Sequence, residues 1–129
     1  MNKQVDTPKV QSLLQAAERE MDFTKQLSVT KQSTATIVRN VYEAFRMIGE
    51  ALLVAKGVRS QEHVDMINAL LYIPVQTARP LSVLDELRRL RNLVNYEGYW
   101  PSVREAQDAL SIADACFSPL LAEVKHMLC

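Results

Sequence analysis

Residues 34–57, TATIVRNVYEAFRMIGEALLVAKG, decide the fold. Their apolar side chains recur at intervals of three and four residues, which places a single stripe along one face of a helix. The stripe consists of Ile37, Val41, Ala44, Phe45, Ile48, Ala51, Leu52 and Ala55. Gly57 follows the stripe and predicts the end of the helix. This stripe is the strongest in the chain.

A first helix is predicted before this stretch. Thr7 is a good N-cap, and Pro8 suits the first helical position. Apolar residues then recur at roughly helical spacing at Val10, Leu13, Leu14, Ala17, Met21 and Leu27. A polar break at residues 30–33 separates the two helices.

A shorter third helix is predicted after Gly57. Ser60 can cap it, with Glu62 in its first turn. Its inward-facing residues are expected to be Val64, Ile67, Leu70 and Leu71. Pro74 and Pro80 then bracket a loop.

Ser82 and Asp85 resemble a capping box that opens a fourth helix. This helix should stop near Gly98, because Pro101 disfavours its continuation.

A second capping box, Ser102 with Glu105, opens the fifth helix. One face of this helix carries Val103, Ala106, Ala109, Leu110, Ala113, Phe117 and Leu120. Pro119 either kinks the helix or begins a separate terminal turn.

The composition suits a single helical domain. The chain has 129 residues, of which 48% are hydrophobic, enough for one domain with its own core. With only three glycines, hairpin turns and therefore strands are disfavoured. We predict one all-α domain over residues 1–129, an up-and-down bundle of four to five helices.

Charge and targeting signals restrict what the protein binds and where it acts. The 15 basic and 15 acidic side chains cancel, so any RNA contact would have to be local, and nothing indicates DNA binding. The first 30 residues lack a secretory signal, and no segment is apolar enough to span a membrane. Two cysteines, Cys116 and Cys129, do not indicate a disulfide framework. We expect a soluble, cytoplasmic protein.

Residues 87–113, LRRLRNLVNYEGYWPSVREAQDALSIA, carry a family resemblance. An Arg-Asn pair, Arg91 and Asn92, precedes Tyr96, a turn and an alanine-rich helix. Together with NVYEAFRMIGEALLVAKGVRSQEHVDMINALL at residues 40–71, this order of features resembles the HEPN family, named for a nucleotide-binding domain of higher eukaryotes and prokaryotes. The resemblance covers roughly residues 33–121 and implies a HEPN-like helical domain.

The resemblance departs from the ribonuclease branch of that family at one position. There, paired subunits bring together two Arg/His sets over the RNA backbone, but the residue in the His position here is Tyr96. Cleavage by the 2′-hydroxyl needs a group that exchanges protons near neutral pH, which His does at a pKa of about 6.5 and Tyr, at about 10, does poorly. His63 and His126 lie in other segments. Catalysis by Arg91, Asn92 and Tyr96 is therefore disfavoured.

If Arg91 is not catalytic, it needs a structural partner, because its neighbours Leu87 and Val94 place it at the edge of the core. Glu50 lies beside the apolar stripe and would otherwise be left without a counter-charge. We predict an ion pair between Arg91 and Glu50 inside the bundle.

Polar and aromatic residues gather where the fourth helix turns into the fifth. Such a cluster suits base stacking, a protein interface or the ordinary packing of a helix end. The cluster consists of Asn92, Asn95, Tyr96, Tyr99 and Trp100. The candidate binding residues are Asn95, Tyr99 and Trp100, together with Arg88. A basic patch could extend the cluster through Arg79, Arg88, Arg89, Arg91 and Arg104. A solvated helix face is favoured, because the neighbouring Asp85, Glu86, Glu97 and Glu105 offset the charge.

No cofactor or metal is expected. His126 and Cys129 are three residues apart, but His63 and Cys116 lie elsewhere and no paired zinc motif is present. A phosphate-binding glycine loop and a Ser-His-Asp signature are also absent from the sequence.

The resemblance leaves three functions open. Small HEPN proteins often work beside a nucleotidyltransferase subunit in toxin-antitoxin or defence systems, and they commonly dimerise. We therefore favour a non-catalytic interaction module that forms a homodimer and has a nucleotidyltransferase as its partner. The alternatives are a metal-independent ribonuclease that uses Arg91, Asn92 and Tyr96, and a homodimeric helical scaffold. A nucleotidyltransferase could also modify Tyr96 or Tyr99.

Overall fold

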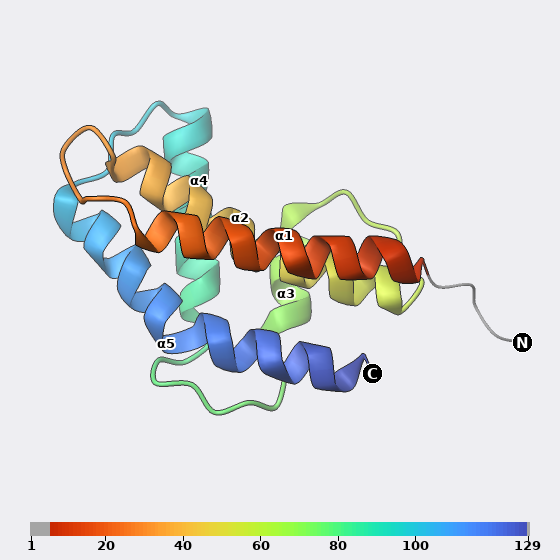
Figure 1. Cartoon of the computed structure of the whole chain (residues 1–129). Helices are drawn as coiled ribbons and strands as arrows, with labels where there is room; N and C mark the ends of the chain where they lie inside the picture. Colours follow the sequence, from red (N-terminus) through yellow and green to blue (C-terminus); the bar gives the residue numbers. More distant parts are fainter. Residues whose placement is uncertain (1–5, 129) are drawn as a thin grey trace, which may run out of the picture.

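The computed structural model describes residues 6–128, which form five α-helices connected by loops (Figure 1). In chain order the helices are α1 (Thr7–Lys25), α2 (Thr34–Ala55), α3 (His63–Leu71), α4 (Val83–Tyr96) and α5 (Val103–Met127). The described residues contain no β-strand. The prediction of an all-α bundle of four to five helices is confirmed. None of these helices combines the length and the apolar composition needed to cross a lipid bilayer.

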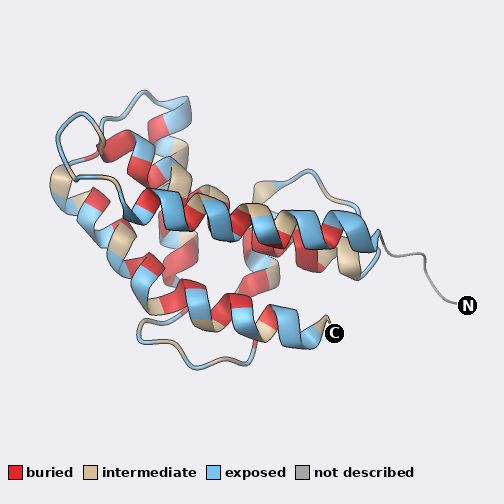
Figure 2. Ribbon diagram, viewed as in Figure 1, coloured by how far each residue is buried: buried red, intermediate tan, exposed pale blue. Residues whose placement is uncertain are grey.

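Helix α2 is the centre of the bundle and contacts each of the other four helices. Helices α1 and α2 run side by side in opposite directions, whereas α3 and α4 run across α2 (Figure 1). Every residue of the predicted stripe is buried except Ala55, which is half-buried. Because neighbours surround α2, its buried surface is wider than the stripe (Figure 2). It also includes Thr34, Ala35, Val38, Tyr42 and Gly49.

The backbones of α2 and α3 come into close contact at Gly49. A Cβ atom on Gly49 would lie 2.0 Å from the main-chain carbonyl oxygen of Met66. Only glycine therefore permits this approach of the two helices. The contact places the start of α3, including His63, beside Tyr42 of α2.

The first residues of α1 and α4 differ from the capping predictions. Asp6, not Thr7, is the N-cap of α1, and its side chain accepts a hydrogen bond of 3.0 Å from the main-chain N–H of Lys9. Thr7 is already helical, because the carboxylate of Asp6 supplies the acceptor one residue earlier. Ser82 occupies the N-cap position of α4, but its backbone is helical and its side chain makes no capping bond.

The capping box that opens α5 is confirmed. The main-chain N–H of Glu105 donates to Ser102 Oγ at 3.1 Å, and the main-chain N–H of Ser102 donates to Glu105 Oε1 at 2.9 Å. The predicted glycine stops are also confirmed, since Gly57 and Gly98 follow α2 and α4 with φ values of 71° and 69°. Glycine adopts this left-handed conformation without the steric cost of a side chain.

Helix α3 begins later than predicted, at His63, with Glu62 in the N-cap position. Ser60 lies in the preceding loop, where its Oγ donates to Asp65 Oδ2 at 2.6 Å. Val64 was expected to face inward, but it is exposed. The face of α3 that packs inward carries Met66, Ile67 and Leu70.

Pro119 lies inside α5, which continues to Met127 and does not restart after the proline. Figure 1 shows the axis of α5 changing direction partway along the helix. Proline has no N–H for the carbonyl four residues before it, Ala115. That carbonyl instead accepts a bond of 3.4 Å from the N–H of Ala78 in the loop before α4. This hydrogen bond therefore links the kinked part of α5 to the loop, so that each stabilises the other.

Candidate functional site

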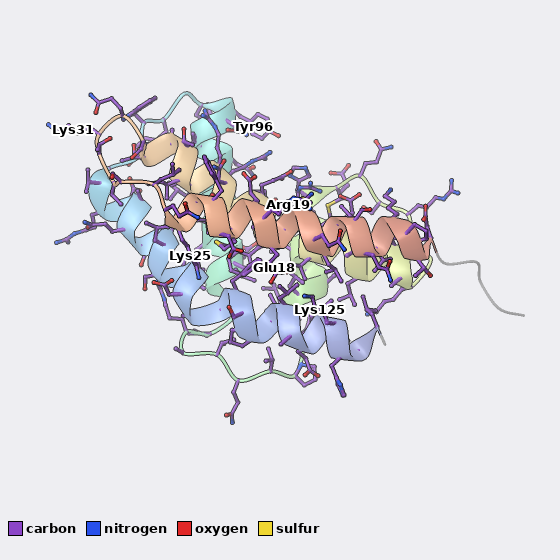
Figure 3. All side chains as sticks on the ribbon, viewed as in Figure 1. Glu18, Arg19, Lys25, Lys31, Tyr96 and Lys125 are labelled. Atoms are coloured by element: carbon purple, nitrogen blue, oxygen red, sulfur yellow. The ribbon has the colours of Figure 1, made fainter. Side chains whose placement is uncertain are left out.

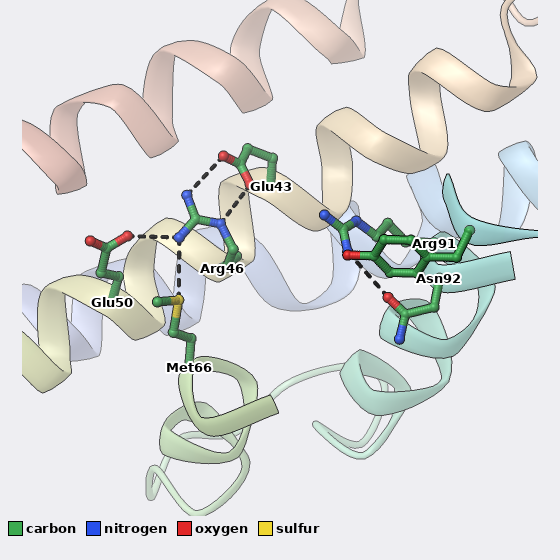
Figure 4. A network of polar contacts seen from close by, with 7 residues as sticks. Glu43, Arg46, Glu50, Met66, Arg91 and Asn92 are labelled. Atoms are coloured by element: carbon green, nitrogen blue, oxygen red, sulfur yellow. Dashed lines mark hydrogen bonds and ion pairs between the residues drawn. The ribbon is translucent and has the colours of Figure 1, made fainter. Parts of the chain in front are cut away.

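The three motif residues, Arg91, Asn92 and Tyr96, lie together on α4. Arg91 Nη1 donates to Asn92 Oδ1 at 3.1 Å and to the hydroxyl oxygen of Tyr96 at 3.4 Å. Five residues correspond to a rise of about 7.5 Å along a helix, which these long side chains can span. Figure 4 shows Arg91 and Asn92 joined in this way.

The guanidinium of Arg91 lies against two tyrosine rings. Its central carbon is 5.0 Å from the ring centroid of Tyr42 and 5.6 Å from that of Tyr96. Both distances are within the range of cation–π attraction. Tyr42 is 1% exposed and Tyr96 is 70% exposed. Arg91 therefore connects a core residue of α2 with a surface residue of α4.

The predicted ion pair between Arg91 and Glu50 is not formed. Glu50 accepts a hydrogen bond of 2.7 Å from Arg46 Nη1, and it lies 3.8 Å from Lys9 Nζ. Arg46 is the nearer partner because it stands one turn before Glu50 on the same helix. Among the described carboxylates, none forms an ion pair with Arg91.

Arg46, which was not among the residues predicted for the site, carries a half-buried ion-pair network. Arg46 Nε and Nη2 donate to the two carboxylate oxygens of Glu43 at 2.6 and 2.8 Å, and Nη1 also donates to Met66 Sδ at 3.2 Å (Figure 4). The hydrogen bonds to Glu43 and Glu50 raise the pKa of Arg46 despite its burial. The spacing of Glu43, Arg46 and Glu50, three and four residues apart, was a visible signal for this network.

His63 belongs to the site, although it lies far from Arg91 and Tyr96 in the sequence. Its ring stacks on Tyr42 with the centroids 5.9 Å apart and the planes 30° from parallel. Among the described residues, neither His63 Nδ1 nor the hydroxyl of Tyr42 has a hydrogen-bond partner, although both atoms are buried. No local motif indicates this arrangement, because it depends on how α3 packs against α2.

Burial and positive charge set the protonation of this pair. Burial raises the pKa of Tyr42 to about 12, although the nearby Arg91 acts to lower it. Burial lowers the pKa of His63, and the charges of Arg91 and Arg46 lower it further against the opposing effect of Glu43 and Glu50. At neutral pH the site therefore contains a neutral imidazole, a neutral phenol and the positively charged Arg91.

Most of the predicted basic patch is neutralised by neighbouring carboxylates. Arg88 Nε lies 2.9 Å from Asp85 Oδ1, and Arg89 Nε lies 3.2 Å from the other oxygen of Asp85. Arg79 Nη1 lies 2.8 Å from Asp108 Oδ1. Arg88, proposed from the sequence as a binding residue, is thus engaged within the protein.

The other predicted binding residues lie at the end of α4. Asn95 Oδ1 accepts from Arg39 Nε at 2.7 Å, and Trp100 Nε1 donates to the carbonyl oxygen of Lys31 at 2.7 Å. Both bonds connect this end of α4 with the start of α2 and the loop before it, a proximity that the sequence did not reveal. We call the four exposed apolar and aromatic residues here the aromatic end: Leu93, Tyr96, Tyr99 and Trp100.

The described residues contain no group of three or more His, Cys, Asp or Glu side chains that could hold a metal ion. Cys129, which formed part of the weak metal pattern considered from the sequence, lies outside the described residues. Cys116 is buried, and its Sγ donates to the carbonyl oxygen of Arg79 at 3.5 Å.

Comparison with protein-family models, with curated proteins and with solved structures returned no match to this chain.

Proposed function

We propose that this chain is a HEPN-like interaction module that binds rather than cleaves, and that it works beside a nucleotidyltransferase in a toxin-antitoxin or defence system. The observation that carries the proposal is the environment of Arg91. Its guanidinium is occupied by Asn92 and by the rings of Tyr42 and Tyr96. Within the motif, the position that would exchange protons in a ribonuclease is a tyrosine, whose ordinary pKa of about 10 is poorly suited to that role.

The surface beside this motif supports a binding role. Tyr96 and Trp100 expose 70% and 60% of their surface. Tyrosine and tryptophan are enriched among the residues that contribute most to protein interfaces. Catalysis would require that groups converge on a reactive atom, whereas binding requires only such an exposed surface.

RNA cleavage by the purified protein is the direct test. We expect no cleavage of mixed cellular RNA by the wild type or by Arg91→Ala. Cleavage by the wild type that disappears in Arg91→Ala would contradict the proposal.

Co-purification tests the partner. We expect a complex when the protein is co-expressed with the nucleotidyltransferases of its own source organism, one at a time. Failure of all of them to bind would remove the nucleotidyltransferase from the proposal.

A ribonuclease is the second candidate, and the position of His63 favours it. His63 lies beside Tyr42, and burial, followed by the charge of Arg91, lowers the pKa of His63. A neutral imidazole could accept the proton of an attacking 2′-hydroxyl. This alternative requires that His63→Asn abolish RNA cleavage as Arg91→Ala does, while His126→Asn leaves cleavage intact.

A homodimer is compatible with either function. Light scattering of the purified protein would measure its mass in solution, and a monomer would exclude the homodimeric scaffold.

A further inference from the structure

The aromatic end is an exposed apolar surface that the bundle does not cover. Its four residues, Leu93, Tyr96, Tyr99 and Trp100, are 46%, 70%, 41% and 60% exposed. They come from the last turn of α4 and from the loop that follows it. Single exposed apolar residues are ordinary, but four that are neighbours in one short segment point to a contact surface.

The polar groups of these aromatic residues are already bonded within the protein. Trp100 Nε1 donates to the carbonyl oxygen of Lys31 at 2.7 Å, and the hydroxyl of Tyr99 donates to Glu105 Oε1 at 2.6 Å. Tyr96 accepts from Arg91. The rings are therefore held in place before binding, which reduces the entropy that a partner would have to overcome.

Positive side chains lie around the aromatic end without counter-ions. Lys31, Arg39 and Arg104 are exposed, and none of the three pairs with a carboxylate in the described part of the chain. Arg39 is fixed by its bond from Nε to Asn95, which leaves its two terminal nitrogens available. Figure 3 shows Lys31 and Tyr96 toward the same end of the molecule. Glu97 is the one carboxylate between Leu93 and Trp100, and it is exposed.

We infer that the aromatic end docks a segment of a partner protein in which carboxylate side chains flank an apolar residue. The apolar residue would pack on the rings, and the carboxylates would meet Arg39 and Lys31. This inference rests on the proposed function and adds the surface and the chemistry of the partner. Arginine, tyrosine and tryptophan are the residue types most enriched at the energetic centres of protein interfaces.

The same surface fits single-stranded RNA less well. The net charge of the chain is zero, whereas proteins that bind RNA nonspecifically rely on an excess of positive charge. Leu93 is aliphatic and half of it faces outward, and it offers no ring on which a base could stack. A protein segment uses both the leucine and the rings.

Selection from a library of short random peptides, displayed on phage and applied to the full-length protein, tests the inference. We expect the selected peptides to be enriched in Asp and Glu beside Leu or aromatic residues. Affinity of the selected peptide should fall about 10- to 30-fold in Trp100→Ala and in Arg39→Gln. Arg39→Lys should lose less affinity than Arg39→Gln, because it keeps the charge but not the bond to Asn95. Tyr72→Ala, which removes an exposed tyrosine after α3, should have no effect.

The opposing outcomes are distinct. Peptides without acidic enrichment, or affinity that is unchanged in Trp100→Ala and Arg39→Gln, would overturn the inference. Binding of a labelled single-stranded RNA with that same dependence on Trp100 and Arg39 would assign the surface to RNA, and self-association lost in both variants would assign it to a second copy. A nucleotidyltransferase complex that survives Trp100→Ala unchanged would refute the docking surface while leaving the proposed function intact. Far-UV circular dichroism of each variant separates loss of binding from loss of folding.

Discussion

At the scale of single residues, the site contains two kinds of polar side chain. Some are hydrogen-bonded to several partners, and others keep a buried polar atom without a partner. Arg46 bonds to two carboxylates and a sulfur atom, whereas Tyr42 and His63 keep one buried polar atom each without a partner among the described residues. Arg91 packs against the rings of Tyr42 and Tyr96, and these rings take the place of a carboxylate partner.

Replacing Arg46 should destabilise the protein. Arg46→Ala leaves Glu43 without an ion-pair partner and Glu50 with only Lys9, at 3.8 Å, and we expect a loss of about 1–3 kcal/mol in the free energy of unfolding. Chemical denaturation measures it. Arg89→Ala is the control, because Arg89 is 74% exposed, and it should change stability by less than about 0.5 kcal/mol. Equal effects of the two variants would show that the network does not stabilise the fold.

Removing the hydroxyl of Tyr42 should cost little or no stability. In Tyr42→Phe the ring still packs against Arg91 and His63, and a buried hydroxyl without a partner is lost. We expect a change between about 0 and 1 kcal/mol in favour of the variant, measured by denaturation. Tyr42→Leu, which removes the ring as well, should destabilise the protein. A loss above about 1 kcal/mol in Tyr42→Phe would mean that the hydroxyl makes a bond in solution.

His63 should make stability depend on pH. Its folded-state pKa is lowered, so the unfolded chain binds its proton more readily than the folded chain does. The stabilisation that neutral His63 contributes is therefore present above the ordinary histidine pKa of about 6.5, and it decreases as the pH falls below that pKa. We expect part of the decrease in melting temperature between about pH 7.5 and 5.5 to be absent in His63→Gln. His126→Gln should follow the wild type, and identical profiles for all three proteins would contradict the assignment.

At the scale of helices, α3 is positioned by one close backbone contact. Gly49 lets α3 approach α2, and that approach places His63 against Tyr42 and Met66 against Arg46. The same short helix thus completes both the ion-pair network and the aromatic stack. A change at Gly49 is transmitted to the site through α3.

Gly49→Ala should separate α3 from α2. The added Cβ would lie 2.0 Å from the carbonyl oxygen of Met66, a main-chain atom that cannot rotate away. We expect a loss of about 2–3 kcal/mol, because overpacking of this kind forces the backbone to shift. Denaturation gives the loss, and NMR shifts of His63 report whether the stack is disturbed. Thr36→Ala, at an exposed position of α2, is the control, and equal stability of both variants would mean that the helices adjust freely.

At the scale of the whole molecule, one continuous core connects all five helices. Buried residues from α1, α2, α3, α4 and α5 belong to a single cluster. The net charge of zero leaves the surface without a general preference for polyanions, so recognition depends on the local features of the aromatic end.

A single core should unfold in a single step. We expect far-UV circular dichroism, which follows the helices, and the fluorescence of Trp100, which follows the aromatic end, to give the same midpoint of thermal unfolding. Trp100 is the single tryptophan of the chain, so its signal is unambiguous. A fluorescence transition at lower temperature would show that the aromatic end detaches before the bundle melts.

The elements of this fold could be predicted from the sequence because their signals are local. The stripe in α2, the capping box at Ser102, and Gly57 and Gly98 each act within one or two helical turns. The closeness of Arg91, Asn92 and Tyr96 was local in the same way, since all three lie on α4. Caps were less certain, because Asp6 and Thr7 are both good N-caps and competition between neighbours decides which is used.

The amino-acid sequence alone determined the all-α class, the number of helices and most of their ends, because periodicity and capping depend on nearby residues. Only the tertiary structure decided which side chains meet across helices: Arg46 in place of Arg91 as the partner of Glu50, His63 against Tyr42, and Trp100 on the carbonyl of Lys31. Such pairings depend on the orientation of one helix relative to another. Here that orientation follows from contacts such as the one at Gly49, which no spacing along the chain encodes.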